Sequence, residues 1–471
     1  MTGPALDIVE FILTARVYSE DQTLDPGDLP PPYRRAFWSA DAPPDESTGR
    51  PAPGGIERPL SITATTISEA TGYAHPWDAI SALMFTSKED FSGTIEFTDR
   101  GMAEKWYRER TTAERLLDNP TLARHFEADF EGVDYETARA RNRPLHADRV
   151  WIDSLLEQMF DEDDEEMLDL VEVRAPEEVE MTLDDLVLTA DQEAEIQKIV
   201  KAIEHRDYLA SIGLREIGKL LFVGPPGTGK TTSARALAHD LDLPFVEVKL
   251  SMITSQYLGE TAKNVDKAFE VAKRLAPCIF FMDEFDFVAK TRSSDEHAAI
   301  KRAVNTLLKS IDEISLIQDE VLLIGATNHP DQLDAAAWRR FDEIVNFPKP
   351  DHGMRADILR VITRRMDIDD FDPSALAGLT QGLTGSDLRL VLREAVLNAL
   401  TEERTTLTQA DLEAAVTDFE ERDNLKNMDM MSDDPDSLIA GNGHDAHDHS
   451  HDHDHADHDN EGDQAHPTDG A

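Results

Sequence analysis

The chain has 471 residues, of which 40% are hydrophobic, and its 95 acidic against 46 basic residues give a formal net charge of −49. This length predicts two or three domains with at least one sizeable core. The charge argues against a general nucleic-acid-binding surface, because Lys and Arg contacts to phosphate supply most non-specific affinity.

The acidic excess also bears on where the protein works. Few lysines and many carboxylates are typical of halophilic archaea, so we expect a salt-adapted, haloarchaeal protein. No apolar run approaches the ~18 residues of a membrane span, and no signal peptide is visible, which predicts a cytoplasmic protein. The single cysteine, Cys278, lies in "CIFFM" and is expected to be a buried, inert thiol.

Residues 1–155 mix helical patterns with proline-rich breaks and predict a separate N-terminal α+β domain. The stretches "LSITATTISEATGY", "PWDAISALMFT" and "GTIEFTDRGMAEKWYRER" predict helix, helix, β-ribbon and helix, the order of a winged helix. The second predicted helix has no Lys or Arg before Lys88, which disfavours DNA reading. A protein-docking winged helix and an unrelated α+β domain both remain open.

Four further segments follow. Residues 156–181 are predicted to be an acidic linker, exposed along Asp161–Glu180. Strand-like runs then alternate with helical segments over 182–348, which predicts an α/β domain with a parallel sheet and helices on both faces. Residues 349–425 are helical throughout. The tail, 426–471, holds eight of the sixteen histidines and is expected to be a disordered solvating segment, with weak Zn²⁺ or Ni²⁺ binding as the alternative.

A glycine-rich motif, "GPPGTGKT", lies between the predicted strand "KLLFV" and the helix "TTSARALAHDL" and matches G-x-x-x-x-G-K-[ST]. Its backbone N–H groups would wrap a polyphosphate, Lys230 would reach the terminal phosphates, and Thr231 would offer a hydroxyl to Mg²⁺. The simpler alternative is a plain glycine-rich turn, which would not require a strand before the motif and a helix after it. The predicted nucleotide-binding residues are Gly224, Pro225, Pro226, Gly227, Thr228, Gly229, Lys230, Thr231 and Thr232.

Polar residues end two later strands. "CIFFMDEFDF" places Asp283 and Glu284 after a buried run, where a carboxylate is costly unless it has a function. Asp283 is predicted to hold Mg²⁺ and Glu284 to act as general base for an attacking water, whereas a helix cap is the simpler alternative. Asn328 ends "VLLIGATN" and is predicted to reach the γ-phosphate or that water, although Asn before "HPD" also suits a turn.

In this order the motifs resemble the AAA family of ATPases, over about residues 182–422. "GATNHPDQLD" is similar to the family's sensor segment, and "GLTGSDL" to its lid motif, which implies that Gly385 and Ser386 lie near the base and ribose. By the same resemblance Asp185 to Leu188 would lie near the adenine. The resemblance implies a P-loop NTPase fold with a helical lid, ATP and Mg²⁺ as substrate and cofactor, and a homo-hexameric ring that acts on protein.

Two further site predictions follow from the resemblance. Arg339 and Arg340, in "DAAAWRRFDE", would reach across a subunit boundary to the neighbour's γ-phosphate. Their adjacency resembles the shorter form found in the meiotic clade and leaves open which arginine dominates; an exposed salt-bridged pair is the alternative. Tyr257, Leu258 and Gly259, in "SQYLGE", would line the ring's pore and grip an extended polypeptide, unless Tyr257 only packs at a helix start.

The leading functional hypothesis is therefore an ATP-hydrolysing motor that remodels, unfolds or disassembles proteins by threading them through a ring. The alternative is an ATP-dependent regulatory switch whose N-terminal domain binds DNA or a transcription complex, the one route left open to nucleic acid. The sequence as given ends "HPTDGA", without the hydrophobic-tyrosine signal of proteasome activators, which argues against a usual proteasome cap.

Overall fold

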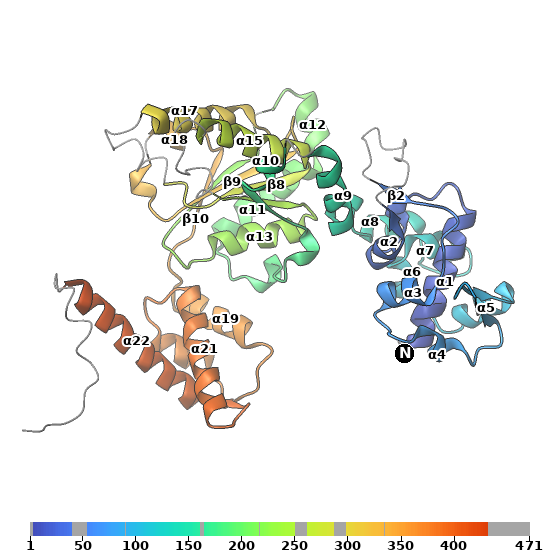
Figure 1. The fold of residues 1–471 in the computed structure, drawn as a ribbon. Helices are drawn as coiled ribbons and strands as arrows, with labels where there is room; N and C mark the ends of the chain where they lie inside the picture. The colour runs from blue at the N-terminus through green and yellow to red at the C-terminus, as the bar shows by residue number, and fades with distance from the viewer. Residues whose placement is uncertain are drawn as a thin grey trace, which may run out of the picture.

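A computed structural model describes residues 3–39, 54–89, 91–160, 164–215, 217–249, 261–286, 298–333 and 335–431. The predicted pore-loop residues Tyr257, Leu258 and Gly259 lie outside the described residues, as does the tail from 432 onward. Residues 426–431, predicted to begin the disordered tail, instead continue the helix α22 (Gln409–Met431). Figure 1 shows an N-terminal helical domain in blue, a central sheet domain in green and yellow, and a helical lid in orange. Among the described residues no helix is long and apolar enough to cross a membrane.

The N-terminal domain is built around its first helix, α1 (Pro4–Glu20), which is buried along most of its length. A helix that is apolar on nearly all sides has to lie inside a domain, and the neighbouring helices cover it (Figure 1). The remaining elements of this domain are α2 (Pro31–Phe37), β1 (Trp38–Ser39), β2 (Gly55–Ile56), α3 (Ala64–Thr71), α4 (Pro76–Ile80), β3 (Thr86–Lys88), β4 (Ile95–Phe97), α5 (Arg100–Arg108), α6 (Ala113–Leu117), α7 (Pro120–Phe126) and α8 (Tyr135–Arg141).

The predicted order of helix, helix, ribbon and helix is found in α3, α4, β3–β4 and α5. Strands β3 and β4 pair antiparallel, and an isolated bridge joins Thr63 to Thr94. Thr63 also caps α3 through the N–H of Thr66, and Gly72 ends that helix at φ 74°, a conformation that favours glycine. Local capping signals therefore fix this part of the domain.

A buried ion pair joins the N-terminal domain to the helix that follows it. Arg34 Nε lies 3.0 Å from Asp148 Oδ2, and both side chains are almost fully buried. Burial raises the pKa of Asp148 to about 7, and the nearby Arg34 guanidinium acts against that rise. Asp148 immediately precedes α9 (Arg149–Met159), which leads into the sheet domain.

The central domain has a six-stranded sheet in the order β10-β6-β9-β8-β7-β5, with β6 to β10 parallel. Strands β6, β8 and β9 are buried at every position, as expected of apolar strands covered on both faces. The strands are β5 (Val171–Arg174), β6 (Lys219–Val223), β7 (Phe245–Val248), β8 (Cys278–Met282), β9 (Val321–Thr327) and β10 (Glu343–Asn346). The helices are α10 (Glu165–Leu168), α11 (Ala190–Glu204), α12 (Arg206–Ser211), α13 (Lys230–Asp240), α15 (Thr261–Arg274), α17 (Ala298–Glu313) and α18 (Ala335–Trp338).

The predicted exposed linker is wrong over the part that the structure describes, residues 164–180, and the predicted parallel sheet also carries an antiparallel edge strand. Within Asp161–Glu180, strand β5 pairs antiparallel with β7 at the edge of the sheet, with Val171 opposite Val248. Met167 and Leu170 are buried in the same core. The abundance of acids conceals the alternating pattern of "VEVR", which suits an edge strand with one buried face.

The lid contains four helices: α19 (His352–Thr363), α20 (Pro373–Leu379), α21 (Gly385–Thr401) and α22 (Gln409–Met431). A short parallel pair, β11 (Ile368–Asp369) and β12 (Leu407–Thr408), joins its ends. The lid has its own apolar cluster, drawn from α19 to α22. The lid therefore has a core of its own, separate from that of the sheet domain.

Candidate functional site

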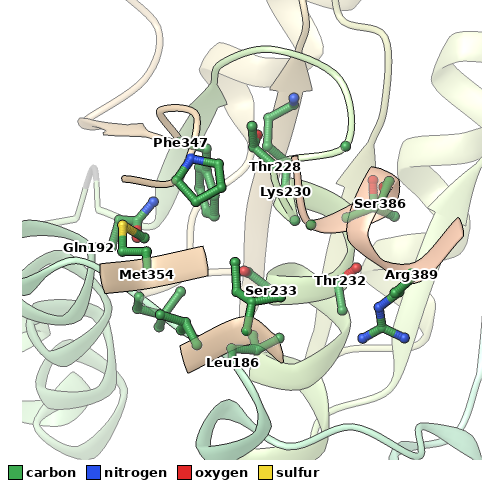
Figure 2. A pocket seen from close by; sticks show the side chains of 18 of the residues that line it. Leu186, Gln192, Thr228, Lys230, Thr232, Ser233, Phe347, Met354, Ser386 and Arg389 are labelled. Atoms are coloured by element: carbon green, nitrogen blue, oxygen red, sulfur yellow. The ribbon is translucent and has the colours of Figure 1, made fainter. Parts of the chain in front are cut away.

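A pocket of about 380 Å³ lies where the glycine-rich loop, the carboxyl ends of the parallel strands and the lid meet (Figure 2). This is the edge at which open α/β sheets bind ligands. The glycine-rich loop follows β6 and leads into α13. The loop residues that line the pocket are Pro226, Gly227, Thr228, Gly229, Lys230, Thr231 and Thr232.

The loop has the conformation that a phosphate cradle requires. Gly229 has φ +99°, a region that side-chain-bearing residues rarely adopt, and α13 begins at the next residue. Gly227 has φ +75°, and a Cβ there would come within 2.6 Å of Thr384 Oγ1 in the lid. The N–H groups at the start of α13 therefore meet a polyphosphate without an intervening side chain, which fits ATP.

Lys230 lies at the centre of the polar contacts. Its Nζ donates hydrogen bonds to the carbonyl oxygens of Gly224 and Pro225, at 2.7 and 2.8 Å, and to Asn328 Oδ1 at 2.8 Å. Burial lowers the pKa of the Lys230 amine, while the nearby Asp283 carboxylate acts to raise it. The structure thus places Lys230 and Asn328, 98 positions apart in sequence, in direct contact.

A second contact joins the loop to the end of β8. Thr231 Oγ1 donates to Asp283 Oδ2 at 2.8 Å. A hydroxyl and a carboxylate side by side are oxygen ligands of the kind Mg²⁺ prefers, with substrate phosphates supplying others. These two residues therefore fit the predicted magnesium site.

Glu284 follows directly and has an unusual backbone. Its φ is +48°, and its N–H donates to Asp283 Oδ1 at 2.8 Å. A non-glycine residue in this region is held there by its surroundings at a cost of about 1–3 kcal/mol, and such residues cluster at functional sites. The Glu284 side chain is exposed and is not among the described residues that line the pocket.

The two predicted arginine fingers have different surroundings. Arg340 donates from Nε to the Leu308 carbonyl oxygen at 2.9 Å, contacts the Ala336 carbonyl and lies 3.1 Å from Asp312. Arg339 is exposed, and its guanidinium has no hydrogen bond or ion pair with the described residues. Neither arginine lines the pocket of its own chain in the described structure.

The residue after the pair connects it to β8. Phe341 packs edge-on against Phe285, with ring centroids 5.2 Å apart and an interplanar angle of 90°. Both rings are nearly fully buried. Phe285 immediately follows Glu284, so a rigid aromatic contact joins the arginine segment to the carboxylate segment of the same chain.

The lid contributes Gly385 and Ser386 to the lining of the pocket. The Ser386 N–H donates to the Gly227 carbonyl oxygen at 3.2 Å, which ties the start of α21 to the glycine-rich loop. Thr384 and Asp387 form a capping box at the same helix start. The lid is therefore held directly over the loop.

The pocket also contains residues that the sequence analysis missed. Apolar side chains of α19 line it at helical spacing, a signal that the sequence does carry: Met354, Ile358, Val361 and Ile362. Gln192 lines it from α11 and donates to the Asn346 carbonyl at 2.8 Å. Arg389 lines it from the lid beside Ser386, and no sequence motif marks it (Figure 2). By contrast, the segment Asp185 to Leu188, which also lines the pocket, is one that the sequence analysis had placed near the nucleotide.

Comparisons with known proteins agree with this architecture. Residues 220–349 match the family described as "ATPase family associated with various cellular activities (AAA)", and residues 370–414 match the AAA+ lid domain. An uncharacterized AAA family ATPase of Sinorhizobium fredii is 38% identical over 242 residues, which are 51% of this chain and 72% of that protein.

Two archaeal proteins are similar over comparable regions. The proteasome-activating nucleotidase of Pyrococcus horikoshii is 39% identical over 231 residues, 47% of this chain and 58% of that protein. The protein of the same name from Thermococcus gammatolerans is 32% identical over 316 residues, 65% of this chain and 79% of that protein. The chain thus spans little more than half of the first of these and about four fifths of the second.

Proposed function

Because the chain belongs to the AAA family of ATPases and is an ATP-hydrolysing enzyme, we propose that it is a motor that remodels, unfolds or disassembles proteins as a hexameric ring. The observation that carries the ATPase part is the meeting of two contacts in one pocket, Lys230 with Asn328 and Thr231 with Asp283. These four side chains come from three separate chain segments.

In the proposed mechanism, loop N–H groups and Lys230 bind the phosphates of ATP. Thr231 and Asp283 would hold Mg²⁺, which neutralises charge on the phosphates. Glu284 accepts a proton from water as the water oxygen bonds to the γ-phosphorus and the bond to the ADP oxygen breaks. Asn328 orients that water from beside Lys230. The products are ADP and phosphate.

We propose that Arg339 completes the site of a neighbouring subunit. It is exposed, has no polar partner among the described residues and does not line its own chain's pocket. An arginine supplied in trans stabilises transition-state charge and is worth about 10³ to 10⁵ in turnover. This arrangement requires a ring or another repeating assembly, and it supports the hexamer expected from the family resemblance.

The proposed base is tested by Glu284→Gln, with Glu313→Gln on α17 as the matched control. Glu313 is exposed, and within the described structure its only ion pair is with Lys309, one helical turn away. Glu284→Gln should bind a fluorescent ATP analogue with nearly unchanged affinity and lose about 10²- to 10⁴-fold in turnover. The control should keep both. Wild-type turnover in Glu284→Gln would remove Glu284 from the mechanism.

The substrate of the motor is proposed to be protein, gripped by Tyr257, Leu258 and Gly259. An unstructured polypeptide should stimulate ATP turnover, and Tyr257→Ala should abolish the stimulation but not basal turnover. Stimulation that survives the change would exclude this loop as the gripping surface. The DNA-binding alternative is disfavoured, because α4 carries Asp78 and no Lys or Arg.

The names of the archaeal relatives favour one more specific candidate, a motor that delivers proteins to a proteasome. Co-sedimentation of this chain with 20S proteasome in the presence of ATP would test it. We also propose a cytoplasmic protein and, on the strength of the net charge of −49, a halophilic one. Its free energy of unfolding should then fall as KCl is lowered from molar to dilute, and an unchanged value would oppose the halophilic assignment.

A further inference from the structure

Three arginines of the lid have no carboxylate partner among the described residues. Arg365 follows α19, and Arg389 and Arg393 lie one turn apart on α21. Elsewhere in this acidic chain arginines are heavily paired; Arg274 and Arg404, for example, each contact two carboxylates. Most described arginines have a carboxylate partner, so three that lack one in one small region form a local excess of positive charge; of these, Arg389 donates to Met181 Sδ at 3.5 Å.

These arginines line one surface groove, which we call the lid groove. It has a volume of about 890 Å³ and lies between α19, α21 and residues 180–185. Arg364 also lines it and is paired with Asp185, at 2.6 Å. Its apolar lining residues include Ile362, Leu392, Val396 and Leu397, and the last of these is 51% exposed.

The lining defines the chemistry of a ligand. Guanidinium groups form strong, charge-assisted hydrogen bonds with carboxylates. The exposed apolar side chains gain free energy when a partner covers them. A peptide that carries carboxylates next to a short apolar run satisfies both parts of the groove.

We propose that the lid groove binds residues 433–440 of this chain's own C-terminal tail. Their sequence is "DDPDSLIA", three aspartates followed by Leu438 and Ile439. Residues 432–471 contain eleven Asp and one Glu, twelve acids in all, and no lysine or arginine. The aspartates match the arginines in charge, and the Leu-Ile pair matches the apolar lining.

The length of the chain permits this contact. Arg422 of α22 pairs with Glu394 of α21 at 3.3 Å, beside Arg393, and Figure 1 shows the two helices side by side. Helix α22 continues for nine residues to Met431, about 14 Å at helical rise. The seven residues from there to Leu438 can span up to about 25 Å. The segment can therefore turn back to α21 of the same lid.

Covalent attachment also favours the chain's own tail over a free partner. A tethered segment has an effective concentration of about millimolar, so weak contacts suffice to populate the bound state. Nucleic acid fits the groove less well, because Glu180 and Asp185 line it together with the arginines. A second copy of the chain remains the competing occupant, and the experiment separates it from the chain's own tail.

Binding in the lid groove would be felt in the nucleotide pocket. Arg389, Asp185, Val361 and Ile362 line both cavities. A tail that holds Arg389 or pulls on Asp185 changes the surroundings of the nucleotide, and by linkage ATP changes the affinity for the tail by the same factor. The tail would thus regulate the ATPase. Its binding does not require ATP turnover or assembly into a ring, so it can be tested apart from the proposed function.

The test uses the full-length chain with Ala440→Cys, labelled with a dye whose emission depends on polarity. Cys278 is fully buried in β8, so the dye reacts at position 440. Blue-shifted emission is expected, compared with a labelled peptide of residues 432–445, at the lowest KCl concentration at which the chain is folded. Arg393→Glu should abolish the blue shift, whereas Arg360→Glu, an exposed arginine of α19 outside the groove, should keep it.

Circular dichroism of both variants verifies that the lid is folded. Leu438→Ser combined with Ile439→Ser should also abolish the shift. A blue shift that persists in Arg393→Glu or in this double variant would overturn the proposal. Mixing the labelled chain with an excess of unlabelled Arg393→Glu chain should leave the shift intact, because a tethered tail keeps its own groove at an effective concentration of about millimolar. Loss of the shift on mixing would identify a second copy as the occupant and would also overturn the proposal.

Discussion

Replacing Arg339 and Arg340 one at a time should separate stability from turnover. Arg340→Ala should lower mainly the stability, and Arg339→Ala mainly the rate of ATP turnover. Arg340→Ala removes charged hydrogen bonds to two carbonyls and an ion pair with Asp312, whose side chain is 52% exposed. The exposed ion pair contributes under about 1 kcal/mol, and each carbonyl contact about 1 kcal/mol. We expect a loss of about 2 kcal/mol and a melting temperature lower by about 4 to 8 °C.

Arg339→Ala removes an exposed side chain with no polar partner in the described structure, so stability should change by less than about 0.5 kcal/mol. Turnover should nevertheless fall by about 10³-fold or more. Differential scanning fluorimetry and a coupled ATPase assay on both variants give the two quantities. A wild-type melting temperature together with lost ATP turnover in Arg340→Ala would refute this assignment. Unchanged ATP turnover in Arg339→Ala would refute it as well.

The action of Arg339 in trans has its own test. A chain with Arg339→Ala keeps a complete nucleotide pocket, and a chain with Lys230→Ala keeps an intact Arg339. Neither should hydrolyse ATP alone. Mixed assemblies should recover part of the activity, because some intact pockets then face an intact arginine. No recovery, in assemblies shown to contain both chains, would place Arg339 in its own subunit's site.

Three further predictions concern the fold. Cys278 should react with a thiol reagent only after unfolding, since burial raises the pKa of its thiol; fast labelling of the native chain would contradict this. The folded pKa of Asp148 lies above its ordinary value near 4, so the stability it contributes is present at low pH and is lost as pH rises from about 4 to about 7, by up to about 4 kcal/mol. Asp148→Asn should remove that slope in urea unfolding at pH 5 and 8, and an unchanged slope would exclude Asp148 as its source. A chain that starts at 182 loses β5 and should be several kcal/mol less stable than one that starts at 149, at about 2 kcal/mol per buried side chain; equal melting of the two would oppose the edge-strand assignment.

The parts of the site that could be predicted depend on local sequence. The glycine-rich motif, with a strand before it and a helix after it, specifies its own backbone. Asp283 and Asn328 end neighbouring parallel strands, whose carboxyl ends meet at one edge of the sheet. Their proximity to Lys230 and Thr231 therefore follows from topology, with no knowledge of side-chain packing.

The parts that could not be predicted depend on tertiary contacts. Arg389 reaches the pocket only because the lid docks on the loop, through the Ser386 N–H and the Gly227 carbonyl. The different surroundings of Arg339 and Arg340 are set by carbonyls of α17 and α18, which no motif marks. The many acidic residues around β5 predicted an exposed linker, although "VEVR" has the short alternating pattern of a strand. The segment is a strand because it pairs with β7, a contact that its local sequence does not specify.

The contact between Phe285 and Phe341 has a consequence for the order of events. Two rigid rings in edge-on contact transmit displacement with little loss, because a packed core deforms poorly. Any shift of Asp283 and Glu284 when phosphate leaves would then reach Arg339, two residues before Phe341. In the proposed ring this arginine enters only one neighbour's site. In such a ring, each subunit would therefore transmit its nucleotide state to one neighbour only, the one whose site its Arg339 enters.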